Sequence, residues 1–162
     1  MHVSLSITEL VSLVVAKQPL PPYVQGVRGE GNAVYLRVDV GSVPGVPWWA
    51  AAAAGVADIA VVVLGYDDGV ATLEVDANVR GLSVDRLLPM FADRIDAELR
   101  KAGLPGGLVT VRRAPGGTVL DVRVQDAIAT RARGLVLTGL ALRDAVLQAD
   151  VEVGPPGQVS LP

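Results

Sequence analysis

The fold is decided by residues 81–103, which read GLSVDRLLPMFADRIDAELRKAG. Apolar side chains recur there at steps of three and four residues, which places them on one face of a helix. Charged side chains cover the other faces. The apolar stripe consists of Val84, Leu88, Phe91, Ile95 and Leu99. We therefore predict an amphipathic helix over about residues 83–102.

The residues at both ends of this helix are typical of helix termini. Ser83 is a suitable N-cap, because its hydroxyl can accept a bond from an amide of the first turn. Gly103 suits the left-handed position that closes a helix. Pro89 falls about two turns in, where a proline removes one backbone bond. Two readings remain open, a separate short turn before Pro89 or one continuous helix, and the unbroken apolar stripe favours the second.

β-like segments lie on both sides of the helix. Residues 70–80 alternate most regularly between apolar and polar side chains, as expected for a strand with one buried face. Residues 58–64 are a continuous β-branched run, which favours a strand buried on both faces, followed by a hairpin loop at 65–69. Gly139 interrupts an alternation and predicts a bulge. The predicted strands cover residues 32–40, 58–64, 70–80, 108–113, 118–124, 135–142 and 146–153.

The N-terminal part of the chain is harder to interpret. A capping box, Ser6 to Glu9, predicts a short helix that ends before Pro19. A strand over residues 3–7 is the competing reading, since Val3, Leu5 and Ile7 alternate. QPLPP at 18–22 is typical of an extended connector, and GVRGEG at 26–31 of a flexible turn. Two further short helices are predicted at 48–54 and 125–133.

These elements indicate an α+β fold. Long alternating hairpin strands form an antiparallel β-sheet with one apolar face, and one amphipathic helix packed on that face buries it. Short accessory helices complete the fold. We expect residues 1–153 to be a single α+β domain and residues 154–162, rich in Pro and Gly, to be a flexible C-terminal tail.

The composition is unusually apolar. Hydrophobic residues make up 51% of the 162 residues and charged residues 19%, and the mean hydropathy is +0.44. The excess apolar surface needs an oligomer interface, a ligand cavity or a membrane surface to cover it. A net charge of −3 gives no reason to expect nucleic acid. The basic residues are mainly Arg, a bacterial-like composition typical of a GC-rich genome.

Few residues suit catalysis. Cysteine is absent, which excludes a disulfide, a thiolate metal site and a cysteine nucleophile. The single histidine, His2, lies at a terminus that we expect to be frayed, so a Ser-His-Asp site would depend on that terminus. Asp67 and Asp68 are expected in a turn rather than on a metal. The sequence therefore predicts no enzyme activity, no cofactor and no metal.

No clear targeting segment is visible. The stretch at 46–64, VPWWAAAAAGVADIAVVVL, is about long enough to span a membrane. Asp58 and the β-branched residues after it argue against a span. Without a basic segment before Leu5, a secretory signal is not expected either. We therefore expect a cytoplasmic protein.

Residues 119–153, VLDVRVQDAIATRARGLVLTGLALRDAVLQADVEV, resemble the late part of tubular lipid-binding domains. The shared features are a strand, a short linker and a Gly-Leu start, Gly134-Leu135, to a closing hairpin. The resemblance implies curved antiparallel strands around a helix, with lipid in the apolar tube between them. It covers only this last part of the chain, and no functional residue is carried over from it.

Two hypotheses for function remain. The leading one is a non-enzymatic module that binds an apolar ligand or lipid between sheet and helix, with contact to a membrane surface as a further possibility. The alternative is a homo-oligomeric structural or interaction protein, whose excess apolar surface is a subunit interface through the 48–54 helix or an edge strand. An equally open alternative is that the apolar residues between sheet and helix simply form a core. The candidate ligand-binding residues are Trp48, Trp49, Leu73, Val75, Leu88, Phe91, Ile95 and Val122.

Overall fold

The computed structural model describes residues 1–78 and 84–154. Within them the helices are α1 (Ile7–Lys17), α2 (Trp48–Ala54), α3 (Val84–Lys101) and α4 (Val124–Arg131), with a 3-10 turn, η1 (Val40–Ser42). The strands are β1 (His2–Ser6), β2 (Val24–Glu30), β3 (Ala33–Asp39), β4 (Val56–Asp67), β5 (Val70–Asn78), β6 (Val109–Ala114), β7 (Gly117–Arg123), β8 (Leu135–Arg143) and β9 (Val146–Val153).

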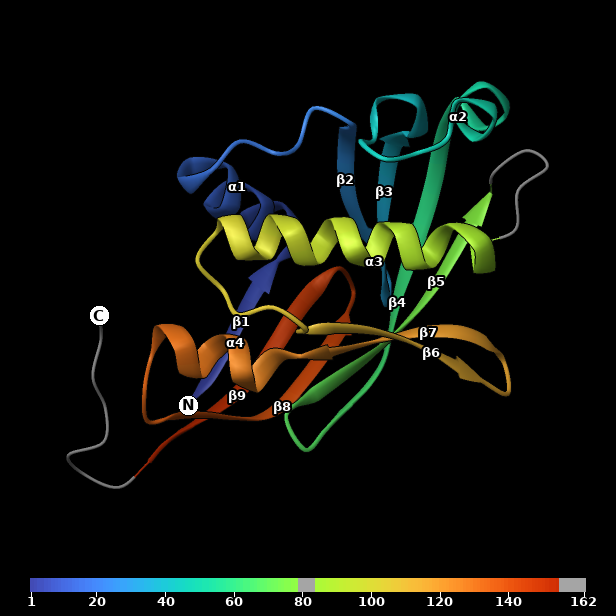
Figure 1. The fold of residues 1–162 in the computed structure, drawn as a ribbon. Coiled ribbons are helices and arrows are strands. Elements are labelled where there is room, and N and C mark those ends of the chain that lie inside the picture. The colour runs from blue at the N-terminus through green and yellow to red at the C-terminus, as the bar shows by residue number, and fades with distance from the viewer. Residues whose placement is uncertain (79–83, 155–162) are drawn as a thin grey trace.

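The α+β fold with antiparallel strands is confirmed, but the strands divide between two sheets (Figure 1). The larger sheet has the order β2-β3-β4-β5-β7-β6, and the smaller one has the order β1-β9-β8. Every pairing is antiparallel. The expected packing of one amphipathic helix on a sheet is found on the larger of the two sheets.

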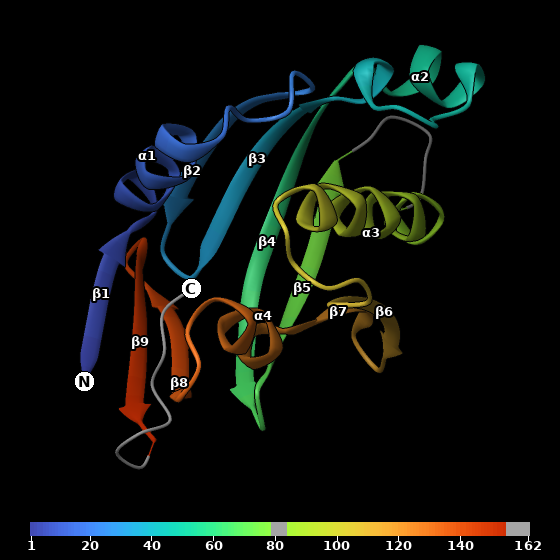
Figure 2. The ribbon, with the colours of Figure 1, turned by 60° about the vertical axis from the view of Figure 1, so that its left-hand side comes forward.

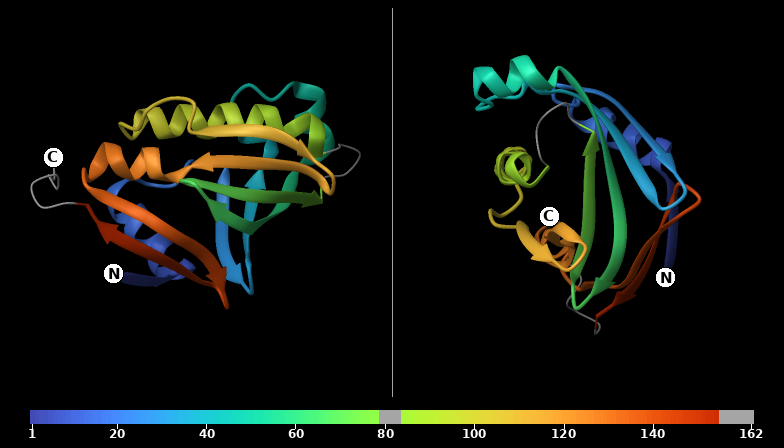
Figure 3. Two further views of the ribbon diagram at one scale, coloured as in Figure 1. Left: turned by 90° about the horizontal axis from the view of Figure 1, so that it is seen from below. Right: turned by 90° about the vertical axis from the view of Figure 1, so that its right-hand side faces the viewer.

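Helix α3 covers one face of the larger sheet, as the right-hand view of Figure 3 shows, where α3 is seen end-on beside the sheet. Its buried Leu87 packs with Val38 and Ile59 of the neighbouring strands. One residue further, Leu88 packs with Ala92 and Leu120. Burying such side chains supplies the main driving force for joining helix and sheet.

The continuous form of the central helix is confirmed, because Pro89 lies inside α3. Gly103 has a φ of +81° and occupies the left-handed position after the helix. Three expectations lie outside the described residues: the Ser83 cap, the end of the strand at 79–80, and the tail from residue 155 onward.

Both readings of the N-terminal segment hold, for different residues. The alternating residues form β1, and the capping box then starts α1 at Ile7, with the Ser6 hydroxyl bonded to the Glu9 amide and the Glu9 carboxylate bonded to the Ser6 amide. The Ser6 amide, together with the Ser6 hydroxyl, lowers the pKa of Glu9. The expectation of a frayed terminus at His2 is wrong, because His2 pairs with Asp150 in the smaller sheet.

Two other expectations are corrected. GVRGEG is not a turn but most of β2, which pairs along β3. The predicted 58–64 strand extends to Asp67 with a bulge between Val63 and Gly65, so the turn is confined to Asp68 and Gly69. This strand is not buried on both faces, since Asp58 and Leu64 are exposed. The bulge predicted at Gly139 is confirmed.

The two sheets are joined by polar contacts near the end of the β4–β5 hairpin, on the side where Figure 2 shows β8 and α4. The Tyr66 hydroxyl donates to the Leu137 carbonyl at 2.9 Å. The Gln125 side chain donates to the Leu135 carbonyl and accepts from the Leu137 amide. Burial raises the pKa of Tyr66, which keeps its hydroxyl protonated as a donor.

Candidate functional site

Four of the residues that the sequence assigns to a ligand site lie in the interior between α3 and the larger sheet. Leu88 is only 2% exposed and is packed on by Leu73 and Val75 of β5. Phe91 is partly buried against the neighbouring core cluster. Side chains fill the space at Leu88, so this part of the interface forms core.

The other predicted residues lie outside this interior. Val122 is half-buried in β7, opposite Val109 and Ala71. Ile95 is 41% exposed although it belongs to the apolar stripe of α3. The predicted residues are therefore not brought together into one site.

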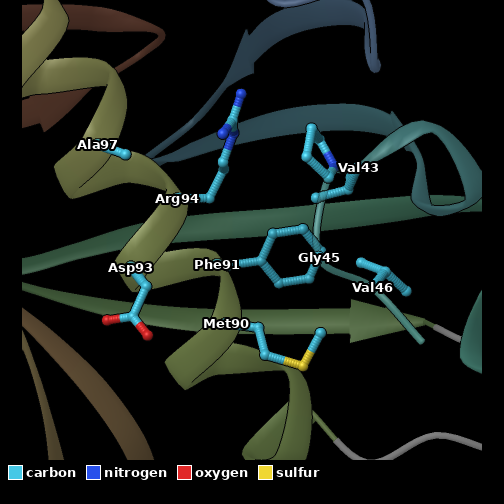
Figure 4. Close-up of a pocket in the computed structure, with 9 residues that line it drawn as sticks. Val43, Gly45, Val46, Met90, Phe91, Asp93, Arg94 and Ala97 are labelled. Atoms are coloured by element: carbon cyan, nitrogen blue, oxygen red, sulfur yellow. The ribbon is translucent and has the colours of Figure 1, made fainter.

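An apolar cavity does lie next to this core, at the flank of α3 (Figure 4). Its volume is about 260 Å³. Phe91 and Met90 extend from α3 toward the segment that joins η1 to α2, which forms the opposite wall. The lining residues are Val43, Pro44, Gly45, Val46, Met90, Phe91, Asp93, Arg94 and Ala97.

A second cavity of about 270 Å³ continues along the same helix. It shares Pro44 and Arg94 with the first cavity, so the two adjoin at these residues. Its other walls are the proline-rich connector at 18–23 and the last turns of α3 at Glu98 and Lys101. Together the cavities follow one side of α3 from Met90 to Lys101.

Arg94 is the polar side chain common to both cavities. Its Nη2 lies 2.8 Å from Oε1 of Glu98, and its guanidinium carbon lies 5.9 Å from the centre of the Tyr23 ring. The Nε atom is buried and has no hydrogen-bond partner among the described residues. A buried donor without an acceptor costs free energy.

Sequence reasoning identified Phe91 but missed most of the wall. Met90, Arg94 and Ala97 follow one another at steps of four and three residues, so they form a second stripe beside the apolar stripe of α3. That spacing was a usable signal. The segment 43–46 gave none, because the sequence shows it only as an interruption after a strand.

Trp48 and Trp49 do not line either cavity. They begin α2, where Trp48 is 81% and Trp49 is 49% exposed. Ala50 of this helix is fully buried. Both indoles therefore lie on the surface, and neither packs into the core.

The carboxylates and arginines of the larger sheet form structural pairs. Nε of Arg112 donates to Oδ2 of Asp121 at 2.6 Å, and the Thr72 hydroxyl donates to Oδ1 of Asp121. The hydrogen bond from Arg112 lowers the pKa of Asp121 and keeps it ionised. Asp68, with a φ of 45°, lies in the β4–β5 turn as predicted. These groups stabilise the sheet and its turn.

The described part of the chain shows neither a metal-binding cluster nor a membrane-spanning helix. Residues 1–78 and 84–154 contain no cluster of three or more His, Asp or Glu side chains placed to hold a metal ion. No helix in the same residues combines the length and the apolar character needed to cross a membrane. Among known proteins, no family model, no curated protein and no solved structure matches this chain.

Proposed function

We propose that this chain is a binding module for a small apolar ligand held against α3. The observation that carries the proposal is the cavity between Phe91 and the 43–46 segment, whose walls are largely apolar. Ligand sites of proteins are concave, mostly apolar and supplied with a few polar groups. Phe91, Val46 and Ala97 meet the first requirement, and Arg94 meets the second.

The size of the site limits the ligand. Pockets for drug-sized molecules measure roughly 300–1,000 Å³, and this cavity is slightly smaller, at about 260 Å³. It fits one ring system or a short acyl segment. The adjoining cavity past Arg94 gives room for a longer, extended molecule such as a single acyl chain. The ligand would lie beside α3 rather than between its core face and the sheet.

The test uses a cavity-filling variant with a matched control on the same helix. Ala97→Phe adds a ring inside the cavity, whereas Ile95→Phe places the same ring at an exposed position that does not line it. Binding of the neutral dye N-phenyl-1-naphthylamine is followed by its fluorescence. We expect Ala97→Phe to weaken binding by about 10-fold or more, and Ile95→Phe to change it by less than about 2-fold.

A complementary measurement looks for a native ligand. The protein is purified gently and weighed by native mass spectrometry before and after organic extraction. An extractable mass on the wild type that is lost in Ala97→Phe supports the proposal. Absence of saturable dye binding by a folded wild-type protein overturns it.

A second function, self-association, is favoured by the exposed tryptophans of α2. Aromatic side chains such as Trp are enriched at the energetic centres of protein interfaces. Helix α1 adds exposed Leu13, Val14 and Val15. Sedimentation velocity over a range of protein concentrations tests this function. A stoichiometric oligomer that Trp48→Ala dissociates supports it, and a monomer at all concentrations contradicts it.

A further inference from the structure

Three polar side chains of the smaller sheet form a hydrogen-bonded chain in the order Ser4, His2, Asp150. The Ser4 hydroxyl oxygen lies 3.0 Å from Nε2 of His2. Nδ1 of the same ring lies 2.7 Å from Oδ1 of Asp150. A hydroxyl, an imidazole and a carboxylate connected in this order form the arrangement that activates a serine for acyl transfer.

The sheet positions all three groups. His2 of β1 lies directly opposite Asp150 of β9. Ser4 is two residues further along β1, so it projects from the same face. Gly139 lies opposite Asp150 on the other side, where a Cβ would come 3.0 Å from Oδ2 of Asp150. Glycine at this position therefore leaves room for the carboxylate.

The carboxylate also decides the tautomer of the ring. An ionised Asp150 can only accept, so the short contact requires the proton to lie on Nδ1 of His2. Nε2 is then the acceptor that faces the Ser4 hydroxyl. This is the protonation state in which His2 can remove the proton of Ser4.

Strand β1 is an edge strand, and this gives the site a donor for an oxyanion. Met1 and Val151 form two backbone hydrogen bonds with each other. Along an antiparallel pair of strands, residue pairs bonded in this way alternate with pairs that are not. The next residues of β1 with the same orientation as Met1 are Val3 and Leu5. The amides of His2 and Ser4 are therefore directed to the open edge of the sheet, where the Ser4 amide can donate to an oxyanion formed at its own hydroxyl.

We propose that Ser4, His2 and Asp150 form a site for acyl transfer from small activated esters. The Ser4 oxygen attacks the ester carbonyl while His2 takes the hydroxyl proton. The acyl–oxygen bond to the alcohol then breaks, and the alcohol leaves with the proton from His2. Water, deprotonated by His2, finally attacks the acyl carbon. The bond from that carbon to the Ser4 oxygen breaks, the acid leaves, and the Ser4 oxygen takes the proton back from His2. This site lies on the smaller sheet, apart from the cavity at α3, and the proposal runs contrary to the expectation of no enzyme activity.

The openness of the site sets its substrate class. His2 and Asp150 have side chains that are 55% and 63% exposed. A site on an open sheet face offers no walls to recognise a large acyl group, so binding is weak and the leaving group must be good. General-base catalysis contributes about 10²–10⁴-fold in enzymes, and we expect the lower end here.

The test is covalent labelling by a fluorophosphonate probe on protein that carries a C-terminal tag and no added residue before Met1. In this reaction the Ser4 oxygen bonds to phosphorus, the phosphorus–fluorine bond breaks, and His2 accepts the proton. Peptide mass spectrometry locates the label. We expect it on Ser4, and we expect the labelling rate to fall about 100-fold in His2→Gln.

The matched control is Ser12→Ala, which removes an exposed serine whose hydroxyl donates to the Thr8 carbonyl and has no imidazole beside it. It leaves labelling unchanged. Labelling of Ser4 that is no faster than that of Ser12, or that persists in His2→Gln, overturns the proposal. Hydrolysis of p-nitrophenyl acetate provides a second assay, in which the His2 imidazole could also attack the ester directly. Ser4→Ala keeps His2, so any hydrolysis by this variant measures that direct attack. Equal hydrolysis by Ser4→Ala and the wild type also overturns it.

Asp150 is a positioning residue in this proposal. Asp150→Asn introduces an amide that can donate to Nδ1 of His2, so the tautomer of the ring is no longer fixed. We therefore expect slower labelling of Ser4 with an unchanged thermal unfolding midpoint. Recovery of part of the rate in Asp150→Glu distinguishes this role from a purely structural one. Loss of the rate in both variants together with loss of the fold would contradict it.

Discussion

Ile7 and Gly29 are in direct contact where the start of α1 meets β2. A Cβ on Gly29 would lie 2.7 Å from Cγ1 of Ile7 and 2.8 Å from the Cβ of Ala145. Backbone bonds follow the same route, from the Ile7 amide to the Ala145 carbonyl and from the Ala145 amide to the Gly31 carbonyl. Gly29 is therefore a second point, besides the end of the β4–β5 hairpin, at which the smaller sheet and α1 reach the larger sheet.

The first prediction concerns this contact. Gly29→Ala places a methyl group where both neighbours already lie, and overpacking of this kind costs about 1–3 kcal/mol. Gly26→Ala is the matched control, since a Cβ there would meet nothing within 4 Å in the same strand. We expect urea unfolding to show a loss of stability for Gly29→Ala alone. Equal effects of the two variants would contradict the contact.

The second prediction separates core from surface on α3. Leu88 is 2% exposed and Ile95 is 41% exposed, although both belong to one apolar stripe. Replacing a buried leucine by alanine costs about 2–5 kcal/mol. We expect that loss in the free energy of unfolding for Leu88→Ala, and less than about 1 kcal/mol for Ile95→Ala. A comparable cost at both positions would mean that another molecule covers Ile95.

The helix and the hairpin strands could be predicted because their signals are local. The spacing around Phe91 and the alternation in β5 each report one buried face, and the structure has both elements. The sequence does not predict β2, because glycines spaced as in GVRGEG are typical of turns. Position 29 needs a glycine because Ile7, which is distant in sequence, lies against it. A contact between distant residues leaves no local pattern in the sequence.

The site shows the same limit. Leu88 and Phe91 were assigned to one lining, yet Leu88 is core and Phe91 reaches a cavity. The difference depends on where the 43–46 segment lies, and the sequence does not encode that position in any simple spacing. The position of His2 near the end of the sequence predicts a frayed residue, but in the structure His2 contacts Asp150 of the last strand. Only the pairing of β1 with β9 brings them together.

The third prediction uses the two tryptophans as reporters. Trp48 is 81% exposed and Trp49 is 49% exposed, so iodide should quench most of the fluorescence of a monomer. Trp48→Phe should remove the larger part of the quenchable signal and change the free energy of unfolding by less than about 0.5 kcal/mol. Protection of Trp48 from iodide that rises with protein concentration would show instead that α2 is covered in an oligomer.

The last prediction concerns pH. The hydrogen bond from Arg112 lowers the pKa of Asp121 in the folded protein, with a further contribution from Thr72. A carboxylate with a lowered folded pKa stabilises the protein fully above its unfolded pKa, which is about 3.9 for aspartate. This contribution is lost as the pH falls through the lower folded pKa, because only the unfolded state binds the proton at first.

Asp121→Asn should therefore be less stable than the wild type at pH 7, with a difference that shrinks as the pH falls below about 4. Urea unfolding at pH values between 7 and 2 measures it. Glu30→Gln is the control, because Glu30 pairs with Arg28 on the surface, where both side chains are about two-thirds exposed, and exposed pairs contribute little. A stability difference for Asp121→Asn that stays constant down to pH 2 would show that Asp121 acts through its shape and not its charge.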